Sequence, residues 1–284
     1  MFRFVSVLLI CLVLSAPSTP CNSKTTSGQN HNSSVSTIKE SYDAKATNKS
    51  CNYGRGKIID IGITKGNFTP KIHVCFDNTT HRTFWTKHYL GRTNTSNSTD
   101  GRTSWSKDFF YKFNPDKIYK KVSNNSDRGH LSPRADFNTD IERKMTYYYI
   151  NAAPQASNLN RGKWRWIEEE VRARANKESS PVKVITGSGG VLFAFNMYNY
   201  TYPEYFFKIV VFKNGQNEVF VGVNNATAAV TTESPFKQSL CKNVIPFCGC
   251  FGYSEGIVYC CKLDKDLMQR FGLEKDDVDY KERW

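Results

Sequence analysis

The sequence predicts a mixed α+β domain built around a mostly antiparallel β-sheet. Segments with strand-like alternation outnumber segments with helical periodicity. Helix candidates are few, so the strands do not alternate with helices as they would in a repeating βαβ array. About 230 residues follow a polar N-terminal region, which is enough chain for one sizeable core, and no internal repeat interrupts them.

Coarse periodicity places the expected elements along the chain. Strands are expected at residues 56–63, 72–76, 83–90, 182–187, 205–211 and 218–223. The best helix candidates are residues 141–149 and 160–177. The glycine-rich stretch at 186–190 follows a strand, but no lysine completes a phosphate-loop pattern there, so we expect a tight turn between strands.

The N-terminal residues resemble a secretory signal. Residues 4–14 form an apolar run that is too short to span a membrane, and Ala16 with Ser18 offers a small-x-small cleavage site. We expect a signal peptide at residues 1–18, a flexible polar leader at 19–48 and the folded domain at 49–284. No later segment is long and apolar enough to anchor the chain in a membrane, so a soluble, secreted, extracellular protein is predicted.

Cysteine usage supports an oxidising compartment. Of the nine cysteines, Cys11 lies in the signal peptide, and the other eight are Cys21, Cys51, Cys75, Cys241, Cys248, Cys250, Cys260 and Cys261. Their spacing does not resemble a zinc site, so disulfides are expected, with a disulfide-rich C-terminal part and a connectivity that stays open. Sequons predict a glycoprotein and occur at Asn32, Asn48, Asn67, Asn78, Asn94, Asn97, Asn124, Asn199 and Asn225.

The most informative stretch is Asp127-Arg128-Gly129-His130, which Pro133 follows. His130 suits proton transfer, and Arg128 can face a phosphate group. Gly129 permits a backbone conformation that a side chain would obstruct, and Asp127 can orient a neighbouring group. A lone histidine more often has only a packing role, but these neighbours favour phosphodiester chemistry.

A second polar pattern follows about thirty residues later. Side chains recur every four residues at Asn160, Trp164, Glu168 and Arg172. In an α-helix they form one stripe along a single face. An oxygen ligand such as Asn160 suits Mg²⁺, and Glu168 can then hold metal-bound water. The alternative for an isolated helix is a solvated face on which Glu168 and Arg172 form an ordinary ion pair, and the glycine-histidine segment upstream favours the metal site.

Together the two patterns resemble those of the DNA/RNA non-specific endonucleases. This family belongs to the ββα-metal, or His-Me finger, superfamily and includes mitochondrial endonuclease G. Asp127-Arg128-Gly129-His130 with Pro133 looks like the family signature, and the family's spacing is matched by Asn151, Pro154-Gln155, Asn160, Trp164, Glu168 and Arg172. Weaker similarity extends from about Ile58 to the C-terminus. The resemblance implies that the α+β domain contains a ββα-metal nuclease motif.

The resemblance also implies a one-metal mechanism. His130 would be the general base that takes a proton from the attacking water, and Asn160 would bind Mg²⁺, or alternatively Mn²⁺, directly. The metal would bridge a scissile phosphate oxygen and the departing 3′ oxygen, so that cleavage leaves 5′-phosphates. The further roles would fall to Glu168 for metal-bound water, Arg172 and Arg128 for the phosphate, and Asp127 and Asn151 for support of the site.

Two groups of residues remain outside this scheme. The family uses an arginine from an upstream strand, for which Arg82 and Arg92 are candidates that spacing does not separate. His73, His81 and His88 lie in strand-like stretches without a partner at metal-binding spacing, so we expect them to be structural or exposed.

Composition agrees with a polyanionic partner. Lys and Arg number 39 against 26 Asp and Glu, which leaves a formal charge of +13. Basic residues lie on both sides of the signature and predict salt-sensitive, sequence-independent binding of DNA and RNA. Charge alone says little, because many secreted proteins are basic, and the interleaved aromatic residues more often build a core than stack on bases. Homodimers occur in the family, but no feature of the sequence establishes one.

Two other classes of protein compete with a nuclease. A secreted binding protein of the same fold would grip nucleic acid without cutting it, yet His130, Asn160 and Glu168 are all present. A glycoprotein ligand or toxin component fits the signal, cysteines and sequons but leaves the signature unexplained. Preference for DNA or RNA, and for single or double strands, stays open.

Overall fold

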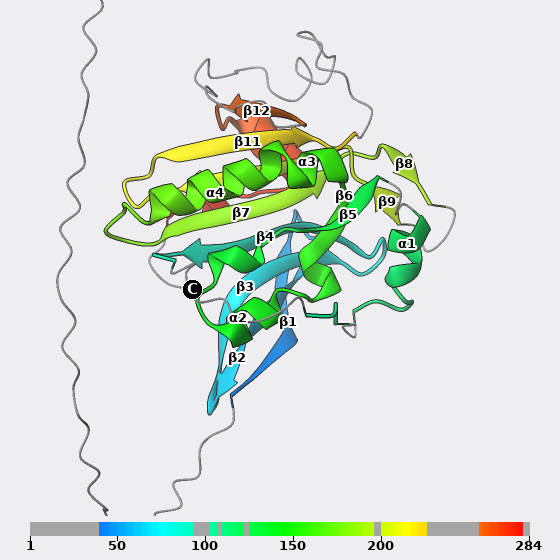
Figure 1. Ribbon diagram of the computed structural model, residues 1–284, viewed down its shortest axis with the longest axis horizontal. Helices are drawn as coiled ribbons and strands as arrows, with labels where there is room; N and C mark the ends of the chain where they lie inside the picture. Colours follow the sequence, from blue (N-terminus) through cyan, green and yellow to red (C-terminus); the bar gives the residue numbers. More distant parts are fainter. Residues whose placement is uncertain are drawn as a thin grey trace, which may run out of the picture. The chain divides into compact units, whose positions relative to one another are not determined.

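The structure, a computed structural model, describes residues 40–93, 103–106, 110–121, 125–195, 200–225 and 256–280. Its main feature is an eight-stranded sheet with the order β1-β2-β3-β4-β7-β10-β11-β12 (Figure 1). Every neighbouring pair in this sheet is antiparallel, which confirms the predicted α+β class. The expected signal peptide at 1–18 and the expected leader up to residue 39 lie outside the described residues.

Each strand segment predicted from periodicity is found in the sheet, at β2, β3, β4, β7, β10 and β11. The sheet consists of β1 Ser41–Cys51, β2 Gly56–Lys65, β3 Asn67–Asp77, β4 Arg82–Leu90, β7 Val182–Gly189, β10 Tyr205–Val211, β11 Asn217–Val223 and β12 Ile257–Cys261. Two small antiparallel pairs stand apart from it, β5 Ser126–His130 with β6 Ala152–Ala156, and β8 Phe193–Ala194 with β9 Thr201–Tyr202. The turn expected at 186–190 starts only at Gly190, where φ is +66°, because β7 continues to Gly189.

The helices are shorter than predicted. They are α1 Asp116–Lys121, α2 Asp140–Met145, α3 Ser157–Arg161, α4 Lys163–Ala175, α6 Lys265–Phe271 and α7 Lys275–Val278, with 3₁₀ turns at Arg134–Asp136 and Tyr149–Asn151. The helix expected at 160–177 is interrupted at Gly162, whose φ of −97° and ψ of −120° are not helical. The helix expected at 141–149 ends at Met145, and the following Thr146 hydroxyl donates to the Arg143 carbonyl.

Both faces of the sheet are covered. Along β10, Phe206 and Val210 contribute to a core cluster on one face, while Phe207 and Ile209 contribute to a second cluster on the other. This alternation follows from the two-residue period of a strand, and burial of both faces explains why β10 is apolar or aromatic at every position except Lys208. Helix α6 contributes Phe271 to the second cluster, where its ring stacks on Phe207 with centroids 3.9 Å apart.

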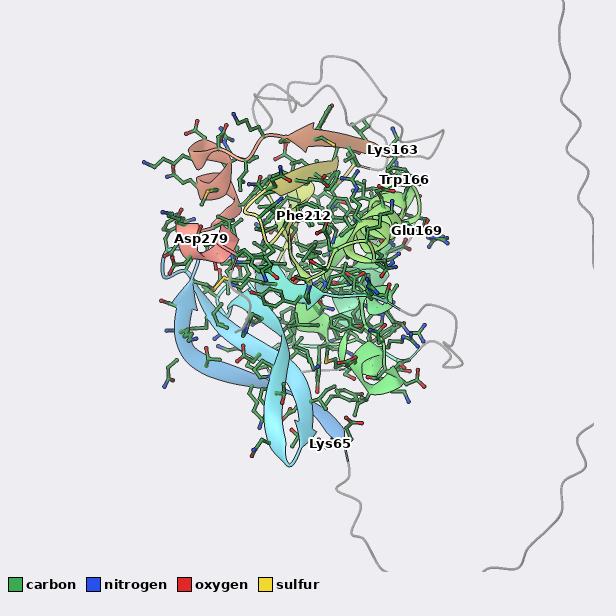
Figure 2. All side chains as sticks on the ribbon, turned by 90° about the vertical axis from the view of Figure 1, so that its left-hand side faces the viewer. Lys65, Lys163, Trp166, Glu169, Phe212 and Asp279 are labelled. Atoms are coloured by element: carbon green, nitrogen blue, oxygen red, sulfur yellow. A yellow bond between two sulfur atoms is a disulfide. The ribbon has the colours of Figure 1, made fainter. Side chains whose placement is uncertain are left out.

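Helix α4 covers the first face beside α3 (Figure 1). Its buried residues follow helical spacing and are Trp164, Ile167, Val171 and Ala175. Of the α4 residues labelled in Figure 2, Glu169 is exposed, whereas Trp166 is half-buried against the same core cluster. This apolar stripe fixes the rotation of α4 about its axis, and thereby the direction in which its polar side chains point.

Strand β1 differs from the prediction of a flexible leader that ends at residue 48. It pairs with β2 from Ser41, opposite Thr64, to Cys51, opposite Gly56. The expected leader boundary is therefore wrong, because a polar segment at a sheet edge can be ordered by backbone hydrogen bonds that composition does not reveal.

A disulfide joins Cys51 at the end of β1 to Cys75 on β3, and Cys260 and Cys261 on β12 are disulfide-bonded as well. The remaining cysteines of the expected framework lie outside the described residues, at Cys21, Cys241, Cys248 and Cys250. Within the part of the chain that the structure describes, no helix is long and apolar enough to cross a membrane.

Candidate active site

The signature residues lie in a compact ββα unit. Strands β5 and β6 form an antiparallel pair in which Asp127 lies opposite Gln155 and His130 lies opposite Ala152, and α3 follows β6 directly. The Gln155 side chain crosses the backbone at Gly129, where an added Cβ would lie 2.3 Å from the Gln155 Oε1. Only glycine fits there, so the close packing of the two strands requires it.

His130 occupies the end of β5 between two aromatic rings. Its ring centroid lies 4.6 Å from that of Trp105 and 5.0 Å from that of Tyr147. Its Nε2 is buried without a hydrogen-bond partner. Burial, helped by the positive charge of Arg134, lowers the pKa of His130 to about 4. The imidazole is therefore neutral at neutral pH and able to accept a proton.

Asp127 fixes the amide of Asn160. Asn160 Nδ2 donates to Asp127 Oδ2 at 2.9 Å, and Arg161 Nε donates to the same oxygen at 2.9 Å. Burial alone would raise the pKa of Asp127, but the hydrogen bonds from Arg161 and Asn160 lower it, so the carboxylate is ionised. Because the amide nitrogen faces Asp127, Asn160 Oδ1 is left to act as a ligand. A neutral oxygen donor held in this way fits a hard divalent cation such as Mg²⁺.

Arg128, which was expected to face a phosphate, is held by a carboxylate that the sequence did not predict. Its Nη2 donates to Asp116 Oδ1 at 2.8 Å, and its guanidinium lies 5.3 Å from the centroid of the Tyr119 ring. Tyr149 donates to the same Asp116 oxygen. Asp116 thus neutralises part of the charge on Arg128 and sets its direction. Sequence reasoning missed Asp116, because a carboxylate on a separate short helix carries no spacing signal.

Asn151 holds the backbone that follows the histidine. Its Oδ1 accepts from the Ser132 backbone N–H at 2.9 Å, and its Nδ2 donates to the Ser132 carbonyl at 2.9 Å and the Thr146 carbonyl at 2.8 Å. The side chain is fully buried. All three contacts are with backbone, so the geometry favours a supporting role over contact with a ligand.

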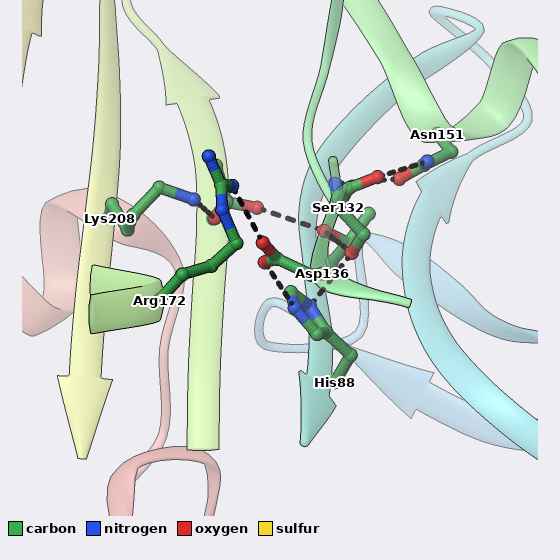
Figure 3. A network of polar contacts seen from close by, with 8 residues as sticks. His88, Ser132, Asp136, Asn151, Arg172 and Lys208 are labelled. Carbon is green, nitrogen blue, oxygen red and sulfur yellow. Dashed lines mark hydrogen bonds and ion pairs between the residues drawn. The ribbon is translucent and has the colours of Figure 1, made fainter. Parts of the chain in front are cut away.

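Arg172 on α4 faces a buried polar cluster (Figure 3). Arg172 Nη1 donates to Asp136 Oδ1 at 3.0 Å, and the Arg172 side chain is only 11% exposed. Arg172 pairs with Asp136 and forms no ion pair with Glu168. The alternative of a solvated helix face with a Glu168–Arg172 ion pair is therefore wrong. Lys208 is buried and donates to Thr186 Oγ1 at 2.6 Å. Burial raises the pKa of Glu168 to about 7, with Lys208 opposing the shift and Asp136 adding to it.

Glu168→Gln is expected to stabilise the metal-free protein more at pH 8 than at pH 5. The carboxyl loses its proton near its ordinary pKa when unfolded and near 7 when folded. The unfolded state therefore binds fewer protons between these values, and wild-type stability falls as pH rises through them. The variant escapes this loss, which we expect to be about 1–3 kcal/mol.

Urea unfolding at both pH values in the presence of chelator measures this difference. The matched control is Glu169→Gln, which removes an exposed carboxylate that pairs with Arg165 on the same helix. An equal stability change at pH 5 and pH 8 for Glu168→Gln would show that this carboxyl has no raised pKa.

Neither upstream arginine contacts another predicted site residue among those described. Arg82 Nη2 donates to the Ser188 carbonyl at 2.9 Å, and Arg92 is exposed. The candidates therefore stay unassigned. Two of the three other histidines have carboxylate partners that their spacing in the sequence did not indicate: His73 contacts Asp60, and the fully buried His88 contacts Asp136.

Known proteins share both the fold and the sequence pattern. A chain in the crystal structure of the EndoG/EndoGI complex is similar in fold, with a TM-score of 0.51 and 17% identity over 74% of this chain and 84% of that chain. The fold is thus that of an EndoG-type nuclease. A salivary endonuclease of Lutzomyia longipalpis is 30% identical over 266 aligned residues. The alignment covers 79% of this chain and 63% of that protein, so the chain spans less than two thirds of its relative's length.

The family model for DNA/RNA non-specific endonucleases matches residues 57–266. This match includes β5, β6, α3 and α4 and therefore every predicted site residue. The chain belongs to the DNA/RNA non-specific endonuclease family, as its signature residues predicted.

Proposed function

We propose that this protein is a secreted endonuclease that depends on Mg²⁺ and hydrolyses phosphodiester bonds of both DNA and RNA to 5′-phosphate products. The observation that carries the proposal is the ββα unit, in which a neutral His130 and an oriented Asn160 occur together. Membership of the family supports the activity. A catalytically silent nucleic-acid-binding protein of the same fold is the alternative.

Each site residue has a role that its contacts support. His130 takes a proton from the attacking water, since its ring is unprotonated at physiological pH. The Trp105 and Tyr147 rings pack against the imidazole and limit its movement. Asn160 would hold the cation through Oδ1, and Asp127 would keep that oxygen from turning away. A divalent cation there would supply charge stabilisation at the phosphate and at the leaving 3′ oxygen.

Positive charge at the site comes from arginines with assigned partners. Arg172 is tied to Asp136 through one nitrogen, which leaves the rest of its guanidinium to face a phosphate. Arg128 contributes a second, partly neutralised charge beside Asp116. Glu168 would order water near the cation in its ionised form, which a nearby positive charge favours.

Secretion rests on independent features. The N-terminal apolar run and the disulfides at Cys51–Cys75, Cys260 and Cys261 suit the secretory pathway. The relative from Lutzomyia longipalpis is described as salivary. The formal charge of +13 suits polyanionic substrates outside the cell.

The test is cleavage of supercoiled plasmid and of unstructured RNA by the purified secreted protein, with Mg²⁺, with chelator, and with Mg²⁺ restored. We expect chelation to lower both rates by at least about 100-fold and Mg²⁺ to restore them. Product ends that require phosphatase before labelling by a polynucleotide kinase would identify 5′-phosphates. Plasmid binding at low salt without cleavage under any condition would instead support the silent binding protein.

A further inference from the structure

His88 lies fully buried in the middle of β4, and both of its ring nitrogens are used. Its Nε2 lies 2.9 Å from Asp136 Oδ2, and its Nδ1 lies 3.0 Å from Ser132 Oγ. Burial alone would raise the pKa of Asp136, but the His88 hydrogen bond and nearby positive charges lower it, so Asp136 accepts. A ring with its proton on Nε2 donates to Asp136 and accepts from the Ser132 hydroxyl, which satisfies both contacts.

These contacts join two parts of the site that are separate in sequence (Figure 3). On one side, Asp136 Oδ1 accepts from Arg172 Nη1 on α4 at 3.0 Å. On the other, Ser132 lies two residues after His130, and Asn151 bonds both its backbone N–H and its carbonyl. His88 is the link between the carboxylate that holds Arg172 and the backbone that follows the general base.

We propose that His88 is a positioning residue that sets the distance between Arg172 and His130. The inference rests on the proposed function, because it assumes that Arg172 faces the phosphate while His130 takes the proton. A rigid strand at the centre of the sheet is a suitable support, since β4 is paired on both sides by β3 and β7. Misplacement of a catalytic group by about 1 Å can lower a rate by about 100-fold without loss of the fold.

Two substitutions separate the contacts of His88. In His88→Gln the amide nitrogen takes the place of Nε2 and retains the hydrogen bond to Asp136. In His88→Asn the shorter side chain reaches only Ser132 and leaves Asp136 without its partner on β4. We expect His88→Asn to lower kcat by about 10–100-fold with little change in KM, and His88→Gln to stay within about 3-fold of wild type.

The matched control is His73→Ala, which removes another histidine–carboxylate contact, between His73 on the neighbouring strand β3 and Asp60. We expect it to leave kcat unchanged. Thermal unfolding of each variant, and binding of a short fluorescent single-stranded DNA in chelator, separate positioning from loss of fold or affinity. Binding should stay within about 2-fold of wild type in all three variants.

Three results would overturn the inference. His88→Asn with wild-type kcat would show that the contact with Asp136 is unimportant for the reaction. Equal losses in His88→Asn and His88→Gln that follow their losses of thermal stability would show a structural role only. A wild-type protein that cuts neither DNA nor RNA would overturn the proposed function and this inference with it, whereas the first two results leave the proposed function intact.

Discussion

His130→Ala is expected to lower kcat for plasmid nicking by about 10²–10⁴-fold, because the variant has no group to take the proton from the attacking water. A pKa of about 4 keeps the wild-type imidazole neutral, so this effect should persist throughout the neutral range. Its aromatic neighbours Trp105 and Tyr147 have no basic group at neutral pH that would replace it. Initial rates at saturating plasmid and fixed Mg²⁺ measure the loss.

Chemical rescue distinguishes a missing base from a disturbed site. Removal of the imidazole leaves a space between two rings, and added free imidazole should restore part of the rate to His130→Ala. His73→Ala serves as the control, since this histidine lies on β3 and contacts Asp60. Nearly full activity in His130→Ala, with a wild-type melting temperature, would remove His130 from the mechanism.

The central strands were predictable because burial dictates their residue pattern. In β10 the side chains alternate between two covered faces, so every residue except Lys208 is apolar or aromatic and the bounds of the strand follow from the sequence. Strands β5 and β6 were missed for the opposite reason. Their sequences are short and carry polar residues, glycine and proline, and they pair only with each other outside the main sheet. Tertiary packing rather than local preference makes them strands.

Only some of the predicted site residues contact one another directly. Asn160 donates to Asp127, and so does Arg161, which was not predicted as a site residue. Arg172 donates instead to Asp136. The prediction that Asn160 and Arg172 lie in one stripe of a single helix is wrong, because the non-helical Gly162 separates Asn160 on α3 from α4. The partners that tune the site were not predictable, since the Asp136 carboxylate is 36 residues from Arg172 and 48 from His88. Contacts at such separations depend on the register of the sheet.

Asn160→Ala is expected to lower kcat by about 10²–10³-fold and to raise the Mg²⁺ concentration needed for half-maximal rate, because the oxygen ligand is lost. Asn160→Asp is expected not to restore the rate, although a carboxylate binds Mg²⁺ more strongly than an amide. Asp127 Oδ2 lies 2.9 Å from the Asn160 amide nitrogen. A second carboxylate at this position repels Asp127 and turns the ligand away, or takes up a proton.

The double variant Asp127→Asn with Asn160→Asp tests this explanation, because it exchanges donor and acceptor while it retains one oxygen ligand and one carboxylate. We expect it to be at least about 10-fold more active than Asn160→Asp alone, although it weakens the contact with Arg161. Mg²⁺ titrations of the cleavage rate, with calorimetric Mn²⁺ binding as an independent measure of the site, give both comparisons. If the double variant is no better than Asn160→Asp in rate or in metal affinity, Asp127 does not act by orienting Asn160, and its hydrogen bonds with Arg161 are the more important contribution to the site.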